Sequence, residues 1–125
     1  MFGKAKAFSS YSVDDLPKAR QFYETTLGLD VEEDRQAGLT LKLATGARIM
    51  IYPKGPAHVP ASYTVLNFPV KDIEKAVDDL GARGVRFERY EGISADEKGI
   101  ATGMGPRIAW FKDPAGNIIS VIQQA

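Results

Sequence analysis

The 125-residue chain contains no cysteine and only one histidine, His58. The missing cysteines exclude disulfide bonds, thiolate nucleophiles and cysteine-ligated zinc sites. Any imidazole chemistry within this chain must therefore use His58.

Net charge and long apolar runs are also missing. Sixteen basic residues balance 16 acidic ones, so no net field attracts nucleic acid or an anionic membrane. The start of the chain has no apolar core of signal-peptide length, and no later run is long enough to cross a bilayer. We expect a cytoplasmic protein with no nucleic acid partner and no membrane partner.

Two apolar runs near the C-terminus stand out against this polar background. Residues 108–112 and 118–122 flank Asp113-Pro114-Ala115-Gly116-Asn117, where proline suits the second turn position and Gly or Asn can take a positive φ. This pattern predicts a β-hairpin. Both arms are apolar at nearly every position, which indicates strands covered on both faces.

The rest of the chain follows one order of elements twice. In the first part we expect a strand over 4–13, a helix capped at Asp14-Asp15 and closed by Gly28, and strands over 29–34, 39–44 and 48–52. A proline-rich linker covers 53–61. We then expect a strand over 63–70, a helix capped by Asp72 and closed by Gly84, and strands over 85–90, 107–112 and 118–123.

An internal duplication accounts for this order. The shift that places Val13 on Val70 also places Asp15 on Asp72, which indicates a repeated unit. One unit alone leaves a sheet face uncovered once its helix has docked on the other face. We therefore expect a single α+β domain over 1–125, with modules at about 4–52 and 62–125.

Alternation along the strands assigns side chains to the two faces of each sheet. The residues expected to face the helices are Ser9, Tyr11, Val13, Leu66, Phe68, Val70, Ile119 and Val121. Those expected on the opposite faces are Phe8, Ser10, Ser12, Val65, Asn67, Pro69, Ile118, Ser120 and Ile122.

Three motifs carry a resemblance to a known family. They are Val13-Asp14-Asp15-Leu16 leading to Phe22-Tyr23 and Leu27-Gly28-Leu29, Val70-Lys71-Asp72-Ile73 leading to Gly81 and Gly84, and Phe111-Lys112-Asp113-Pro114-Ala115-Gly116-Asn117. With these motifs the chain resembles the vicinal oxygen chelate superfamily of glyoxalase, bleomycin-resistance and extradiol dioxygenase proteins. The resemblance covers essentially the whole chain. It implies two tandem βαβββ modules whose curled mixed sheets surround a cavity, with the helices on the outside.

The resemblance also implies where a metal would be bound. Enzymes of the superfamily usually hold a divalent ion with His or Glu side chains, and the matching places here are Phe8, Val65 and Ser120, with Met50 or Tyr52 as the fourth. None of these side chains suits a hard divalent cation. We therefore expect no metal and no cofactor, which disfavours the reactions that need the ion as a Lewis acid.

What remains at these places resembles a small-molecule pocket. Its expected apolar walls are Phe8, Met50, Tyr52, Val65 and Trp110, and its expected hydrogen-bonding groups are Ser10, Asn67 and Ser120. In the alternative, Trp110 is a core residue, and Phe8 and Met50 fill the former metal site and leave little cavity.

The bleomycin-resistance proteins of this superfamily bind without metal and hold a planar antibiotic between aromatic side chains. By this resemblance we predict a metal-independent homodimer that sequesters or senses an apolar or aromatic ligand. The alternative is an enzyme, a glyoxalase-type lyase, isomerase or dioxygenase with a non-standard site. A third possibility is a member with a filled cavity that acts through its outer surface.

Other polar residues have two interpretations each. His58 could serve as a general acid or base, but an exposed loop residue is favoured because the sequence places no carboxylate beside it. Ser10 and Ser120 would be nucleophiles only with a base alongside. The long connection over 91–106 is typical of a lid, with Met104 and Arg107 as ligand contacts; otherwise Arg107 is a solvated charge at a strand end.

Overall fold

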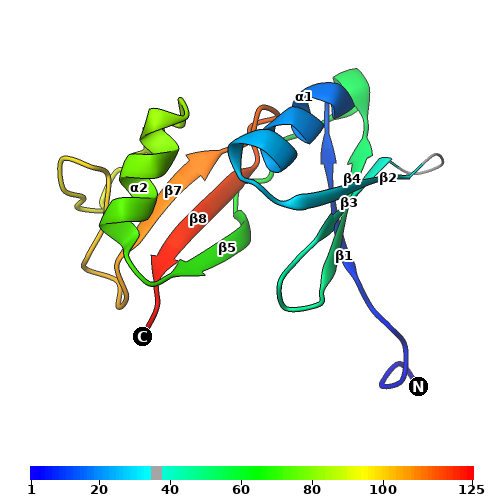
Figure 1. Cartoon of the computed structure of the whole chain (residues 1–125), viewed down its shortest axis with the longest axis horizontal. Helices are drawn as coiled ribbons and strands as arrows, with labels where there is room; N and C mark the ends of the chain where they lie inside the picture. The colour runs from blue at the N-terminus through cyan, green and yellow to red at the C-terminus, as the bar shows by residue number, and fades with distance from the viewer. Residues whose placement is uncertain (35–37) are drawn as a thin grey trace. The chain divides into compact units, whose positions relative to one another are not determined.

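A computed structural model of the chain describes residues 1–34 and 38–125. The chain divides into two compact units, Met1–Val59 and Pro60–Ala125, and each contains one four-stranded sheet (Figure 1). Each unit has the order strand, helix and three strands. The α+β fold of two βαβββ modules is confirmed. Within the described residues, no helix is long and apolar enough to cross a membrane.

The first unit is built on a sheet of order β1-β4-β3-β2, in which β1 is parallel to β4. Its elements are β1 Ser9–Val13, α1 Leu16–Gln21, the π-helical turn η1 Phe22–Thr26, β2 Asp30–Asp34, β3 Gly38–Lys42, β4 Arg48–Pro53 and the 3-10 turn η2 Gly55–Ala57. The Asp15 carboxylate accepts a hydrogen bond from the Lys18 backbone N–H at 3.1 Å, which caps α1 as expected.

Two elements of the first unit differ from expectation. The strand expected over 4–13 begins only at Ser9, where its pairing with Ile49 of β4 starts. The helix expected to reach Gly28 widens into a π turn, in which the Leu27 N–H bonds to the Phe22 carbonyl at 2.9 Å. Gly28, at φ +72°, ends it as expected.

The core of the first unit lies on the helix side of its sheet. Val13, Tyr23, Leu39, Leu41 and Ile51 have no exposed surface, which confirms the expected direction of Val13. The hydroxyl of Tyr11 donates to that of Tyr23 at 2.7 Å, so these two buried polar groups partner each other.

The second unit repeats the arrangement with sheet order β5-β8-β7-β6 and with β5 parallel to β8. Its elements are β5 Thr64–Val70, α2 Ile73–Ala82, β6 Phe87–Glu88, β7 Ile108–Lys112 and β8 Ile118–Gln123. The Asp72 carboxylate caps α2 by accepting from the Lys75 N–H at 3.1 Å. Ile119, Phe111 and Ala109 have no exposed surface and form the core of this unit.

The strand expected over 85–90 is only two residues long, because another segment occupies the rest of the β7 edge. Ala101 bridges to Ile108 and also to Ala95, and Ile100 is fully buried. The connection over 91–106, expected as a lid, is therefore tied to the sheet through Ala95 and Ala101. Its longest exposed stretch is 102–106.

The hairpin between β7 and β8 is confirmed, and a buried carboxylate organises its turn. Asp113 is 4% exposed and accepts hydrogen bonds from the backbone N–H groups of Ala115 and Asn117 and from the Asn117 side-chain amide. Asn117 in turn accepts from the Ala61 N–H at 3.1 Å. Gly116 takes the positive φ that the turn requires, +85°. In β8 three consecutive residues are buried, whereas β7 alternates buried and less buried positions, so the expectation of two covered faces holds for one arm only.

We expect Asp113→Ala to lower the free energy of unfolding by about 2–4 kcal/mol, because it removes charge-assisted hydrogen bonds and leaves buried donors without an acceptor. Urea unfolding followed by circular dichroism measures this. Asp14→Ala is the control, because Asp14 is exposed and precedes the capping residue of α1; its effect should stay within about 0.5 kcal/mol. Equal unfolding midpoints for the two variants would contradict this role of Asp113.

Candidate functional site

In the first unit, three of the expected site residues share the sheet face that points away from the core. The strand register places Ser10 beside Met50 and Ser12 beside Tyr52. Because the intervening residues Tyr11 and Ile51 are buried, alternation directs Ser10, Met50 and Tyr52 to the other face. Phe8 lies just before β1, and 63% of its surface is exposed.

A cavity of about 430 Å³ opens in the first unit, a volume suited to a small molecule. Its lining residues are Lys6, Ala7, Phe8, Thr40, Gly46, Ala47, Arg48 and Met50. Phe8 and Met50 were expected in the pocket. Ser10 and Tyr52 lie on the same sheet but are not among the described residues that line this cavity.

Two cations contribute to this cavity, Lys6 and Arg48. Sequence reasoning missed Arg48, although a signal was present: it lies two residues before Met50 on β4, and alternate residues share a face. Thr40 was also missed. Thr40 lies beside Met50 because β3 pairs with β4. The sequence of one strand alone does not predict that pairing.

A serine and the only histidine meet beside β1. The Ser12 hydroxyl and His58 Nδ1 are 2.8 Å apart, and both residues are half-buried. The expectation that His58 is an exposed loop residue is therefore wrong, because the η2 turn brings the linker back over β1. A hydroxyl next to an imidazole is the pairing found in activated serine nucleophiles, but the base lies beside Ser12 and not beside Ser10 or Ser120.

In the second unit, three of the expected residues form one row across the sheet. Ser120 pairs with Asn67 on one side and with Trp110 on the other. The buried Ser120 hydroxyl donates to Asn67 Oδ1 at 2.6 Å. Val65 departs from this regularity, because a β-bulge between Thr64 and Leu66 shifts the register at its position.

Trp110 of this row packs against Tyr90, which lies in the connection between β6 and β7. The rings of Trp110 and Tyr90 meet edge to face, with centroids 5.5 Å apart. The Tyr90 hydroxyl is buried and has no hydrogen-bond partner within the described part of the chain. Burial raises the pKa of Tyr90, and the nearby carboxylate of Glu88 raises it further.

The residues present do not fit the divalent metal that the resemblance implies. Phe8, Val65, Ser120, Met50 and Tyr52 offer hydrocarbon, thioether and hydroxyl groups, which are poor ligands for such an ion. Across residues 1–34 and 38–125, no three His, Cys, Asp or Glu side chains are grouped to hold a metal ion. Several carboxylates form surface ion pairs instead, namely Glu32–Lys42, Glu74–Arg107 and Asp78–Lys98. Arg107, just before β7, thus forms an ion pair with Glu74 of α2.

We expect the fluorescence of Trp110, the only tryptophan, to report the ionisation of Tyr90, because a tyrosinate quenches an adjacent indole. The midpoint of quenching should lie above pH 10.0, the ordinary pKa of tyrosine. Since the pKa is raised in the folded chain, stability is retained below pH 10 and falls as the pH rises through the folded-state pKa.

Tyr90→Phe should abolish this quenching, and Tyr63→Phe, at a residue that is 68% exposed, should leave it unchanged. Circular dichroism at each pH separates quenching from unfolding. A midpoint at or below pH 10 in the folded wild-type chain would contradict the assignment.

Comparison with known proteins places this geometry in a family context. The Bacillus subtilis (strain 168) protein YraH, itself uncharacterized, is 30% identical over 122 residues, which cover 87% of this chain and 90% of YraH. The structure of TnmS3, an antibiotic binding protein from Streptomyces sp. CB03234, matches with a TM-score of 0.66 and 24% identity over 98% of both chains. The structure of lactoylglutathione lyase from Agrobacterium tumefaciens has the same TM-score with 17% identity, over 96% of this chain and 93% of the lyase.

The two structural matches show a shared fold and no more, because a binding protein and an enzyme match equally well. A sequence model of the family gives the assignment: it matches residues 8–121. The chain belongs to the Glyoxalase/Bleomycin resistance protein/Dioxygenase superfamily.

Proposed function

We propose that this protein binds an apolar or aromatic small molecule without a metal ion, and acts by sequestering or sensing it. The observation that carries this proposal is the cavity of about 430 Å³ in the first unit, with Phe8 and Met50 among its lining residues. Ligand pockets typically measure about 300–1,000 Å³ and combine apolar walls with a few polar groups.

The state of Phe8 supports an aromatic ligand. Phe8 is 63% exposed although it lines a cavity, so a planar ligand would cover apolar surface that is now in water. Covering such surface is worth roughly 25 cal/mol per Å², and a ring pair adds about 0.5–1.5 kcal/mol. Met50, with its flexible thioether, adapts to ligands of different outline.

The available donor groups favour binding over the metal-dependent reactions of the superfamily. TnmS3 is an antibiotic binding protein and the Agrobacterium protein is a lyase, so the fold is compatible with either role. The residues at the implied metal places are not metal ligands in this chain, which supports the first role.

We expect Phe8→Ala to weaken binding of the uncharged probe N-phenyl-1-naphthylamine about five- to twentyfold, equivalent to about 1–2 kcal/mol of lost contact. The emission of this probe rises in apolar surroundings, so a fluorescence titration gives the Kd. Phe2→Ala is the matched control, since Phe2 is 80% exposed and lies outside the lining of the cavity. The proposal fails if the probe does not bind the wild-type chain, or if both variants behave alike.

We also propose that the protein is a homodimer. In their own sheets β1 and β2 are edge strands of the first unit, and β5 and β6 are edge strands of the second. Edge strands present backbone groups that a second copy can pair with or cover. Light scattering on the purified protein should give a molar mass twice that of one chain at micromolar concentration. A molar mass equal to that of one chain at concentrations up to about 100 µM would contradict the proposal.

A further inference from the structure

We propose that the cavity of the first unit selects organic anions, with an aromatic body on Phe8 and Met50 and an oxyanion group held by Arg48 and Lys6. The inference rests on the proposed binding function and names the chemical class of its ligand. Carboxylates, sulfonates and phosphate esters share the chemistry that it requires.

The charged side chains that line the cavity are of one sign. Lys6 and Arg48 line it, and none of the described residues that line it is acidic. The chain as a whole has equal numbers of acidic and basic residues, so this local excess of positive charge does not follow from composition. An anion entering the cavity meets attraction without a competing carboxylate in the lining.

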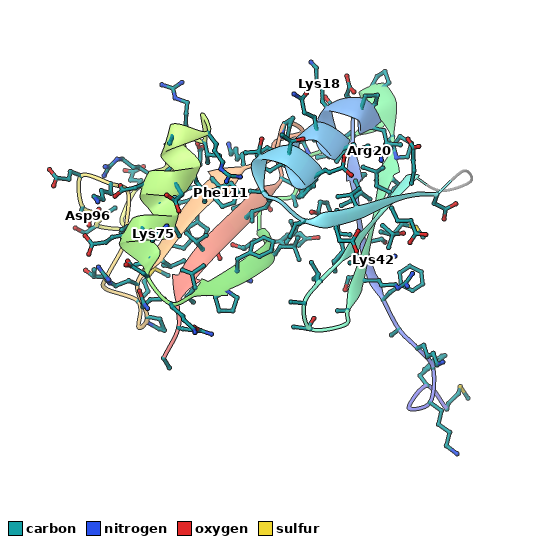
Figure 2. All side chains as sticks on the ribbon, in the orientation of Figure 1. Lys18, Arg20, Lys42, Lys75, Asp96 and Phe111 are labelled. Carbon is teal, nitrogen blue, oxygen red and sulfur yellow. The ribbon has the colours of Figure 1, made fainter. Side chains whose placement is uncertain are left out.

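Both cations are available to a ligand. Among the residues that the structure describes, neither Lys6 nor Arg48 takes part in a salt bridge, whereas Lys42 pairs with Glu32 at 3.0 Å. Lys42, which is labelled in Figure 2, is paired with Arg48 in the register of β3 and β4. The Lys42 ammonium is the main cause of the lowered pKa of Glu32, and Arg48 contributes less. The nearby Glu32 carboxylate is thus paired with Lys42 and not with Arg48.

The backbone at Arg48 is held by a tight turn between β3 and β4. The Leu43 N–H bonds to the Ala47 carbonyl at 3.0 Å, and the Gly46 N–H bonds to the Leu43 carbonyl at 2.9 Å. The Thr45 hydroxyl accepts from the Ala47 N–H at 3.2 Å. Arg48 follows at once as the first residue of β4. Its planar guanidinium matches a carboxylate, sulfonate or phosphate with two parallel hydrogen bonds.

The arrangement of the lining suits an amphipathic ligand. Phe8 lies two residues after Lys6, and Met50 lies two residues after Arg48. Each apolar wall therefore has a cation beside it on the same stretch of chain. A ligand that covers Phe8 and Met50 with a ring system brings any anionic substituent toward the two cations.

Two probes that share one ring system test the inference. The anionic probe 8-anilino-1-naphthalenesulfonate differs from uncharged N-phenyl-1-naphthylamine by its sulfonate, so the ratio of their Kd values isolates the charge. We expect the anion to bind the wild-type chain about tenfold more tightly, with the advantage shrinking as salt rises. Arg48→Gln should remove most of that advantage and leave the Kd of the uncharged probe within about twofold.

Further variants distinguish the loss of a positive charge from a change in the shape of the cavity. Arg48→Lys should restore part of the preference, because it keeps the charge but loses the two-pronged geometry. Lys6→Gln should lower it by about threefold, and Lys4→Gln, a lysine outside the lining, should leave it unchanged. Thermal unfolding confirms that each variant is folded.

The outcomes distinguish this inference from the function on which it rests. Saturable, Phe8-dependent binding of the uncharged probe, with no preference for the anion, overturns the inference and leaves the binding function standing. An equal loss for both probes in Arg48→Gln also overturns it, because the arginine then supports the shape of the cavity. Failure of both probes to bind the wild-type chain overturns the binding function itself.

Discussion

The parallel pairing of the first strand of each unit with its last strand is the constraint on which the rest of the structure depends. β1 pairs with β4 and β5 with β8, both in parallel. A parallel pair cannot be joined by a tight turn, so the chain leaves the first strand through a helix, begins again at the far edge of the sheet and returns through antiparallel strands. The helix then packs on one face of the sheet, α1 against β3 and α2 against β8. In the first unit, the opposite face stays open to side chains that are not needed for the core.

That open face explains how a fold associated with metal enzymes can hold a different kind of site. On the core side, Val13, Leu41 and Ile51 are fully buried, and any change there costs packing energy. On the other side, the stability of the unit does not require particular residues, so the chemistry of that face can vary while the fold remains. Here the cavity beside it is lined by a phenylalanine, a methionine and an arginine, whose side chains suit apolar and anionic groups better than a metal ion.

Long-range hydrogen bonds complete the polar parts of both units. Ser12 meets His58 across 46 positions of sequence, and Ser120 meets Asn67 across 53. In each case the hydroxyl group of a serine on a strand finds its hydrogen-bond partner on a segment that is distant in sequence and adjacent in the fold. Buried hydroxyl and amide groups need such partners, so these pairs stabilise the rows of side chains in which they lie.

The order and type of the elements, the hairpin turn at Asp113 and the capping of both helices can be predicted from the sequence alone. These features depend on residues close together in the chain, through periodicity, turn geometry and local hydrogen bonds. Strand alternation also indicated that Phe8 and Met50 share a face. The folded structure was needed to find the register between strands, the bulge at Val65, the hydrogen bond between Ser12 and His58, and the place of Lys6 and Arg48 in one cavity. Those features depend on which distant segments pair, and pairing is set by the packing of a whole sheet, which no short stretch of sequence specifies.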